Sequence, residues 1–190
     1  MKTYIVDNGS KYLPDLLSFT AAMSPEVISF SELSTNKLKA TDLVILSGGH
    51  TEPVLWHDKF YAEEISIISH HTGPIIGICL GFELICHVFG SHLHFLDHRQ
   101  KGMVEIKPMT ENLIVGNSQK IQVYENHNWA VEKVEKPLVA LASSEDGVEV
   151  IRHESRPIYA MQFHPEGKEG NGKEVFLNIL EELRRLKDAR

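Results

Sequence analysis

The sequence predicts an α/β fold, namely a mostly parallel open sheet with helices on both faces and a few added antiparallel strands. Short continuous apolar runs such as Leu43–Leu46 and Pro74–Ile78 are typical of parallel strands that are buried on both faces. Segments with helical periodicity separate these runs, and a β-α-β rhythm favours a parallel sheet covered by helices. After Met103 the pattern changes to alternating apolar and polar residues, which favours antiparallel strands.

The first half of the chain alternates between strands and helices. The opening strand, Tyr4–Val6, stops at the turn signal Asp7-Asn8-Gly9-Ser10, because such residues favour turns over strands. Gly90 is expected to close the third helix, since glycine is common just after a helix ends. In chain order, the expected strands are at 4–6, 27–30, 43–46 and 74–78, and the expected helices are at about 13–19, 59–69 and 80–89.

The second half is expected to add short, mostly antiparallel strands between Met103 and Ile158. A last strand, Tyr159–Phe163, then leads into a C-terminal helix from Lys173 to about Lys187. No internal repeat or linker interrupts the chain, so residues 1–190 are interpreted as a single domain. Ligands of such sheets bind at the carboxyl ends of the strands. The residues at those ends are Asp7, Gly49, Cys79 and His164.

Composition and charge exclude several classes of function. The formal net charge is −7, and lysine and arginine form no stripe that could follow a phosphate backbone, so nucleic acid is not an expected partner. No apolar run approaches the roughly 18 residues that span a bilayer, and no signal-peptide pattern is present. Cys79 and Cys86 lie about 10 Å apart along one expected helix, too far for a disulfide. Free thiols suit a reducing compartment, so a cytoplasmic location is expected.

The most specific feature is the run Gly77-Ile78-Cys79-Leu80-Gly81 between an expected strand and an expected helix. It is the thiol counterpart of the Gly-x-Ser-x-Gly nucleophile elbow, in which a strained turn exposes the nucleophile. The helix N-terminus is expected to favour the thiolate of Cys79. The competing interpretation is a buried structural cysteine, which is the role expected of Cys86.

A base and an orienting carboxylate follow the last expected strand. His164 and Glu166 are two residues apart in Gln162-Phe163-His164-Pro165-Glu166, so their side chains point the same way if the segment is extended. One nitrogen of His164 is expected to face Cys79 while the other donates to Glu166. At the end of another strand, the amide of Gly49 is expected to form an oxyanion hole with the amide of Leu80.

Together these segments resemble the triad, or class I, glutamine amidotransferases, and the resemblance covers nearly the whole chain. Ser47-Gly48-Gly49, the Cys79 elbow and the His-Pro-Glu run are similar to the oxyanion loop, the elbow and the signature of that family. The run Asp7-Asn8-Gly9-Ser10-Lys11-Tyr12 resembles the first loop of GMP synthetase glutaminases. The family fold is flavodoxin-like. The resemblance therefore agrees with the fold expected from the sequence pattern.

The resemblance also implies a substrate-holding segment. Asn126-His127-Asn128-Trp129-Ala130-Val131 is similar to a loop in the small subunit of carbamoyl phosphate synthetase. By that similarity Asn126, Asn128 and Trp129 contact the amino-acid end of the substrate, and the oxyanion loop adds Gly48. The family loop has glycine at the position of Asn128, and asparagine is the residue that best replaces glycine in a left-handed conformation.

The implied activity is hydrolysis of glutamine through a γ-glutamyl thioester on Cys79, without a cofactor. The family passes the ammonia to a synthetase, so a separate synthetase chain is an expected partner, with GMP synthetase the expected system. A metal site is not expected, although His92, His94 and His98 raise that alternative because histidines at this spacing can share one face of a strand.

One departure from the family leaves the substrate open. Most glutamine amidotransferases carry glutamine four residues after the nucleophile, where this chain has Glu83. An ionised glutamate can only accept hydrogen bonds, so Glu83 is expected to bind the substrate by accepting from its amide. It also raises the pKa of a neighbouring thiol. The order Cys79-Leu80-Gly81-Phe82-Glu83 also resembles the elbow of γ-glutamyl hydrolases. Two alternatives therefore stay open, namely a free-standing γ-glutamyl hydrolase or peptidase and a regulatory module without catalysis.

Overall fold

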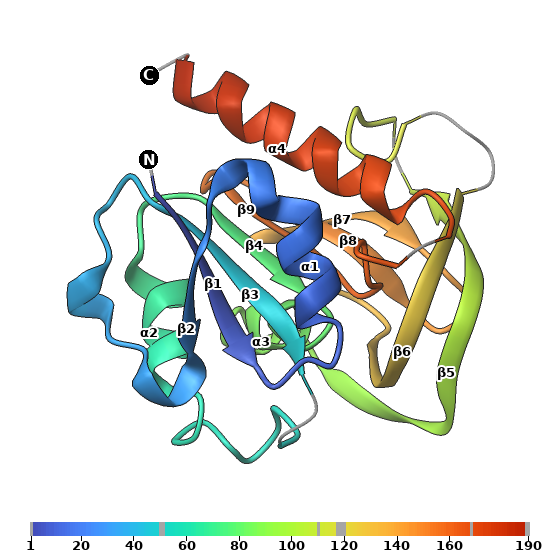
Figure 1. Ribbon diagram of the computed structural model, residues 1–190. Coiled ribbons are helices and arrows are strands. Elements are labelled where there is room, and N and C mark those ends of the chain that lie inside the picture. Colours follow the sequence, from blue (N-terminus) through green and yellow to red (C-terminus); the bar gives the residue numbers. More distant parts are fainter. Residues whose placement is uncertain (1, 50–51, 110, 117–120, 168, 189–190) are drawn as a thin grey trace.

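The strands of the protein form one mixed sheet, seen in the computed structural model (Figure 1). The structure describes residues 2–49, 52–109, 111–116, 121–167 and 169–188. The strand order is β2-β1-β3-β4-β9-β8-β7-β5-β6. The strands are β1 (Thr3–Asn8), β2 (Glu26–Ser29), β3 (Leu43–Gly49), β4 (Ile75–Ile78), β5 (Leu93–Pro108), β6 (Ile121–Val131), β7 (Leu138–Ser143), β8 (Val148–His153) and β9 (Ile158–Met161). The helices are α1 (Leu13–Thr20), α2 (Ala62–His70), α3 (Leu80–Val88) and α4 (Gly172–Asp188), with single 3₁₀ turns η1 (Ala21–Met23), η2 (Phe30–Glu32) and η3 (Thr35–Lys37).

The parallel half of the sheet contains β2, β1, β3, β4 and β9, each paired in parallel with the next. The chain adds β2 on one side of β1 and β3 on the other, so the strand order reverses between β1 and β3. Such a reversal opens a crevice at the carboxyl ends of the strands. The predicted α/β fold with a mostly parallel sheet is confirmed.

Helices cover both faces of the sheet, as predicted. Ile67 and Ile68 of α2 and Leu84 of α3 pack in one buried apolar cluster against one face. Leu16 of α1 and Phe176 of α4 pack in a second cluster against the other face. Figure 1 shows α4 and α1 together on the side opposite α2. Among the described residues, no helix combines the length and the apolar character needed to cross a membrane.

The antiparallel half differs in length from the prediction. The prediction of short strands from Met103 onward is wrong for β5, which has 16 residues and begins at Leu93. It pairs with the 11 residues of β6 to form a long ribbon, visible beside the sheet in Figure 1. The early start was missed because the register shifts between Phe95 and Gln100. A shift of that kind breaks the alternation by which a strand is read from sequence.

Two element boundaries also differ from the prediction. The helix expected from residue 59 begins only at Ala62, because the preceding residues form turns in which Phe60 N–H donates to the carbonyl of His57 at 2.8 Å. The last strand ends at Met161, two residues before the predicted end. Gly90 has φ +79 and its N–H donates to the carbonyl of His87, so it ends α3 as expected.

A buried carboxyl group links α2 to the end of β1. Glu64 is 1% exposed, and the side chain of Asn8 lies near enough to lower its pKa. Burial raises the pKa of Glu64 to about 7, because a charged carboxylate is poorly solvated inside the protein. The folded state therefore holds a proton at a pH where the unfolded chain has released it.

Glu64→Gln is expected to change how stability depends on pH. The natural chain should lose free energy of unfolding as pH rises from 4.5 to 7, because its folded-state pKa exceeds the ordinary value of 4.5. At about 1.36 kcal/mol per pKa unit, this shift corresponds to a loss of up to about 3 kcal/mol in the free energy of unfolding. The glutamine side chain carries no charge at any pH, so the variant should not show this loss. Urea unfolding of both proteins at pH 5 and pH 8 measures the difference. An identical pH dependence of the two proteins would contradict the expectation.

Candidate active site

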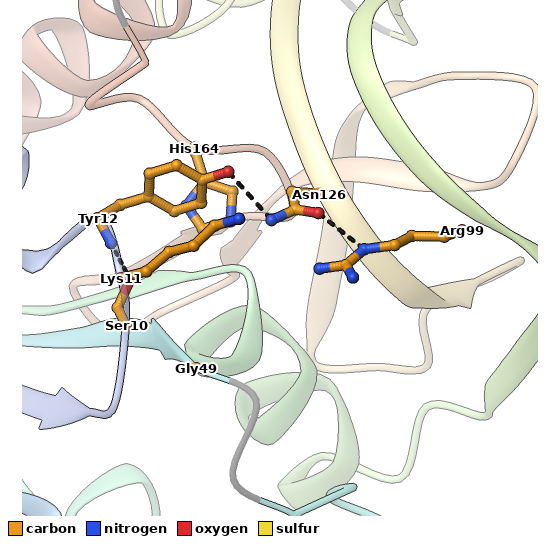
Figure 2. Close-up of a pocket in the computed structure, with 7 residues that line it drawn as sticks. All are labelled: Ser10, Lys11, Tyr12, Gly49, Arg99, Asn126 and His164. Carbon is orange, nitrogen blue, oxygen red and sulfur yellow. Dashed lines mark hydrogen bonds between the residues drawn. The ribbon is translucent and has the colours of Figure 1, made fainter.

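Two adjoining cavities lie where the parallel strands end. The thiol cavity has a volume of about 270 Å³ and is lined by Gly49, Glu52, Pro53, Cys79, Leu80, Glu83, Phe95, Arg99, Asn126, His127, Asn128 and Trp129. The outer cavity has a volume of about 280 Å³ and is lined by Ser10, Lys11, Tyr12, Gly49, Arg99, Asn126 and His164 (Figure 2). The two cavities share Gly49, Arg99 and Asn126, so they adjoin at these side chains.

The elbow at Cys79 has the strand–turn–helix context that the sequence predicts. Cys79 connects β4 to α3 with φ 50 and ψ −102, a conformation that costs energy for a residue other than glycine. Its N–H donates to the carbonyl of Met161 at 2.9 Å. A Cβ at Gly77 would lie 2.6 Å from the carbonyl oxygen of Gly81, and one at Gly81 would lie 2.5 Å from that of Leu46. Both positions therefore require glycine.

His164 and Glu166 form a buried pair. His164 Nδ1 lies 2.9 Å from Glu166 Oε1, and the two residues are only 4% and 7% exposed. An ionised carboxylate can only accept, so Nδ1 donates its proton and Nε2 carries the lone pair. A Cβ at Gly48 would lie 2.9 Å from His164 Cε1 and 3.5 Å from Cys79 Cβ. The imidazole and the elbow thus both border the space that a Cβ at Gly48 would occupy.

Tyr12 and Asn126 extend this arrangement into the outer cavity. The ring of Tyr12 lies against that of His164, with centroids 4.4 Å apart. Asn126 Nδ2 donates to the hydroxyl of Tyr12 at 3.0 Å, and Arg99 Nε donates to Asn126 Oδ1 at 2.9 Å (Figure 2). Arg99 carries no sequence signal that indicates a place in the site. Tyr12 belonged to the quoted first loop, but its contact with His164 spans most of the chain and has no local sequence signal.

The two amides expected to form an oxyanion hole lie in one cavity. Gly49 and Leu80 both line the thiol cavity, and the backbone N–H of Leu80 lowers the pKa of the Cys79 thiol. A Cβ at Gly49 would lie 2.2 Å from the carbonyl oxygen of Asn8 and 2.9 Å from Leu80 Cδ2. Glycine is therefore required for β3 to end this close to the elbow.

The charges around the sulfur oppose its ionisation. Burial, then Glu83 and then Glu166 raise the pKa of Cys79 well above its ordinary value. The N–H of Leu80 at the helix N-terminus lowers the pKa of Cys79, as expected of that terminus, but burial and the two carboxyl groups outweigh it. The effect expected of Glu83 is present.

Glu83 and Gln162 lie directly beside the nucleophile. Burial raises the pKa of Glu83 to about 7, although His127 and a hydrogen bond from Gln162 act in the opposite direction. Gln162 Nε2 lies 3.4 Å from Glu83 Oε1 and 3.9 Å from Cys79 Sγ. Near neutral pH the carboxyl group is therefore divided between its charged and neutral forms. Gln162 was quoted in the sequence motif but was given no role there.

The substrate-holding segment is part of a strand. Asn126, Asn128 and Trp129 line the thiol cavity, and they belong to β6 and not to a loop. The suggestion that Asn128 adopts a left-handed conformation is wrong. Among the described residues other than glycine, positive φ occurs at Ser24, Trp56 and Cys79. Antiparallel pairing with β5 keeps the backbone around Asn128 extended.

A buried polar network supports this segment of β6. His127 Nδ1 lies 2.7 Å from the carbonyl oxygen of Trp129, and Nε2 lies 2.8 Å from Glu125 Oε2. A carbonyl only accepts, so Nδ1 donates to it and a single proton lies between Nε2 and Glu125. Burial raises the pKa of Glu125 to about 7, and it also raises that of the neighbouring Glu149. Ser144 Oγ donates to Glu149 at 2.7 Å.

The histidines that suggested a metal site are not gathered into one. His98 Nε2 lies 3.3 Å from Gln100 Oε1 and 4.0 Å from a carboxylate oxygen of Asp146. Throughout the described part of the chain, histidine, cysteine, aspartate and glutamate form no group of three that could hold a metal ion.

Known proteins are similar to this chain in sequence and in fold. The family model described as glutamine amidotransferase class-I matches residues 4–182. A glutamine-hydrolyzing GMP synthase subunit of Thermoplasma volcanium is 30% identical over 184 residues, which cover 95% of this chain and 91% of the relative. The corresponding GMP synthase subunit of Thermococcus kodakarensis is 33% identical over 190 residues, which cover 93% and 96%.

Two solved structures extend the comparison. A Thermoplasma acidophilum protein described as a GMP synthase subunit has a TM-score of 0.87 and 27% identity, over 100% of this chain and 96% of that one. A glutamine amidotransferase from Thermotoga maritima has a TM-score of 0.72 and 16% identity, over 98% of this chain and 85% of that one. Because its identity to this chain is only 16%, the Thermotoga maritima structure shows a similarity of fold alone.

Glu83→Gln is expected to make Cys79 more reactive above pH 7. The natural Glu83 carries most of its negative charge there, because its pKa is about 7, and this charge raises the pKa of the thiol. Removing it should increase the rate of alkylation by iodoacetamide at pH 8 several-fold, with a smaller increase at pH 6. Both proteins should carry Cys86→Ala so that a single thiol is labelled.

The matched control for this measurement is Glu64→Gln. That variant also removes a buried carboxyl group whose pKa is about 7, but Glu64 is not among the groups that shift the pKa of Cys79. Its alkylation rate should equal that of the natural protein. An unchanged or lower rate in Glu83→Gln would show that Glu83 does not restrain the thiol.

Proposed function

The chain belongs to the class I glutamine amidotransferase family, and on this premise we propose that it hydrolyses glutamine with Cys79 as nucleophile, His164 as base and Glu166 as orienting group. One observation carries the proposal. The elbow residue Cys79 and the imidazole of the His164–Glu166 pair lie against the same space, the one that a Cβ at Gly48 would occupy. A nucleophile, a base and a carboxylate that orients the base are the groups that acyl transfer requires.

In the proposed acylation step, Cys79 Sγ attacks the side-chain carbonyl carbon of glutamine while its proton passes to His164 Nε2. Glu166 accepts from Nδ1 and stabilises the imidazolium that forms. The amides of Gly49 and Leu80 donate to the oxygen of the tetrahedral intermediate. His164 then returns the proton to the leaving nitrogen, so that ammonia departs and a γ-glutamyl thioester remains.

Deacylation repeats the sequence with water as the nucleophile. His164 takes a proton from water, the thioester carbon is attacked, and glutamate leaves as the proton returns to the sulfur. Asn126, Asn128 and Trp129 line the thiol cavity and are proposed to hold the amino-acid end of the substrate. Gly48 is proposed to leave room for the substrate between thiol and imidazole.

The ammonia is proposed to pass to a separate synthetase chain. The relatives named above are subunits of a glutamine-hydrolyzing GMP synthase, and this chain covers more than nine tenths of their length. Residues 1–190 are proposed to act as one glutaminase domain, with the GMP synthetase reaction as the expected destination of the ammonia.

A second candidate function is hydrolysis of γ-glutamyl peptides, which share the γ-glutamyl part but release an amine. The observation that favours it is Glu83, buried beside Cys79. An uncharged Glu83 can donate to a substrate carbonyl, whereas an ionised one can only accept from an amide. The two candidates differ in the leaving group that the site accepts.

Ammonia release from glutamine by the purified chain is the test of the proposed function. Release is expected from the natural protein, and Cys79→Ala should abolish it because no thioester can form. A γ-glutamyl peptide offered at the same concentration should be cleaved more slowly. Faster cleavage of the peptide would favour the second candidate. A diazoketone analogue of glutamine that fails to label Cys79, with neither substrate turned over, would contradict both.

Glu166→Gln is expected to lower kcat for glutamine by roughly 10²–10⁴-fold, because the amide cannot stabilise the imidazolium and permits the wrong tautomer of His164. KM should change much less, since Glu166 lies behind His164 and not against the substrate. Glu169→Gln removes an exposed carboxylate three residues further on and should leave both constants unchanged. Equal loss in the two variants would contradict the role assigned to Glu166.

A further inference from the structure

A bulge in β5 lies beside the thiol cavity. Phe95 pairs with Trp129 and Gln100 pairs with His127, so the four residues Leu96–Arg99 stand opposite the single residue Asn128. Extra residues in one strand bend it and redirect its side chains, and bulges are frequent next to active sites. Here the redirected side chain is Arg99, which lines both the thiol cavity and the outer cavity.

The side chain of Arg99 is held by one hydrogen bond at its inner nitrogen. Nε donates to Asn126 Oδ1 at 2.9 Å, and within the described part of the chain Asn126 is its hydrogen-bond partner. Figure 2 shows the guanidinium turned toward the other residues that line the outer cavity, with its two terminal nitrogens below Asn126 in this view. As far as the described residues go, four of the five N–H donors of the arginine remain for a ligand in this position.

The cations and the acids of the site lie at different places. Glu83 and Glu166 lie close enough to Cys79 to raise the pKa of its thiol. Arg99 lies at the junction of the two cavities, and Lys11 lines the outer one. A γ-glutamyl compound carries its reacting carbonyl at one end and a carboxylate at the other. When the carbonyl lies at the sulfur, the carboxylate is repelled by the acids and attracted by the guanidinium.

We propose that Arg99 binds the α-carboxylate of the substrate through its terminal nitrogens. The site would thereby select γ-glutamyl compounds whose α-carboxylate is free. This inference rests on the proposed function for the position of the reacting carbonyl at Cys79. Guanidinium and carboxylate match in a two-point hydrogen-bonded pair, which fixes direction as well as distance. Asn126 holds the guanidinium from behind, and its amide nitrogen also donates to Tyr12, which lies against His164.

The test compares binding of glutamine with binding of glutamine α-amide, which keeps the side chain and the amino group but lacks the α-carboxylate. Cys79→Ala serves as the background, so that neither ligand is consumed, and titration calorimetry measures both dissociation constants. Arg99→Gln should raise the dissociation constant of glutamine by about 10- to 100-fold, as expected for loss of charged hydrogen bonds. It should change binding of the α-amide by less than about 3-fold, because that ligand has no carboxylate to lose. Arg99→Lys should fall between, since lysine keeps the charge but not the two-point geometry.

Lys101→Gln is the matched control, because it removes a cation two residues further along β5 that lines neither cavity. It should leave both dissociation constants unchanged. Equal weakening of glutamine and its α-amide in Arg99→Gln would overturn the inference, since it would mean that Arg99 only supports Asn126. No weakening of either ligand would overturn it as well, and so would failure of both ligands to bind the Cys79→Ala background.

Failure of this inference is distinguishable from failure of the proposed function. Ammonia release is measured on the natural protein, whereas ligand selectivity is measured on the Cys79→Ala background. Glutamine binding that depends on Arg99, without ammonia release, would support the carboxylate site and contradict the hydrolysis. Ammonia release with no change of selectivity in Arg99→Gln would support the hydrolysis and overturn the carboxylate site.

Discussion

The close backbone contact between β3, β4 and α3 is the constraint on which the site depends. A Cβ at Gly77 would meet the backbone of Gly81, and one at Gly81 would meet that of Leu46. Only this approach lets the chain turn within one residue from β4 into α3, which gives Cys79 its positive φ. The strain at Cys79 persists because strands buried on both faces cannot move apart without opening the core. The thiol therefore points to the carboxyl ends of the strands, where His164 lies three residues after the end of β9.

The second constraint is the burial of several carboxyl groups beside that thiol and behind β6. Glu83, Glu125 and Glu149 are all buried, and burial raises the pKa of each. Such groups cost stability when they ionise, so they share protons and hydrogen bonds with His127 and Ser144. The network fixes the position of β6, which forms the wall of the thiol cavity. Stability and the shape of the cavity thus depend on the same side chains.

The sequence predicted the features that depend on neighbouring residues. The buried strands, the elbow between two glycines and the pairing of His164 with Glu166 follow from short-range patterns and recur in the structure. The 16-residue length of β5 and the position of Arg99 could not be predicted, because they depend on a register between strands that are separate in the sequence. Glu83 was expected to raise the pKa of Cys79, and it does, but the larger contribution of burial was not expected, since burial is a property of the whole fold and not of the elbow.

A raised pKa at the nucleophile is compatible with the proposed mechanism. In the free protein burial favours the neutral thiol, so the nucleophile must form by proton transfer to His164 when a substrate is bound. The same low-dielectric surroundings that disfavour an isolated thiolate strengthen its attraction to the imidazolium that the transfer creates. Glu166 stabilises that imidazolium from the opposite side. A site built in this way keeps its thiol protonated and less exposed to oxidation until a substrate occupies the cavity.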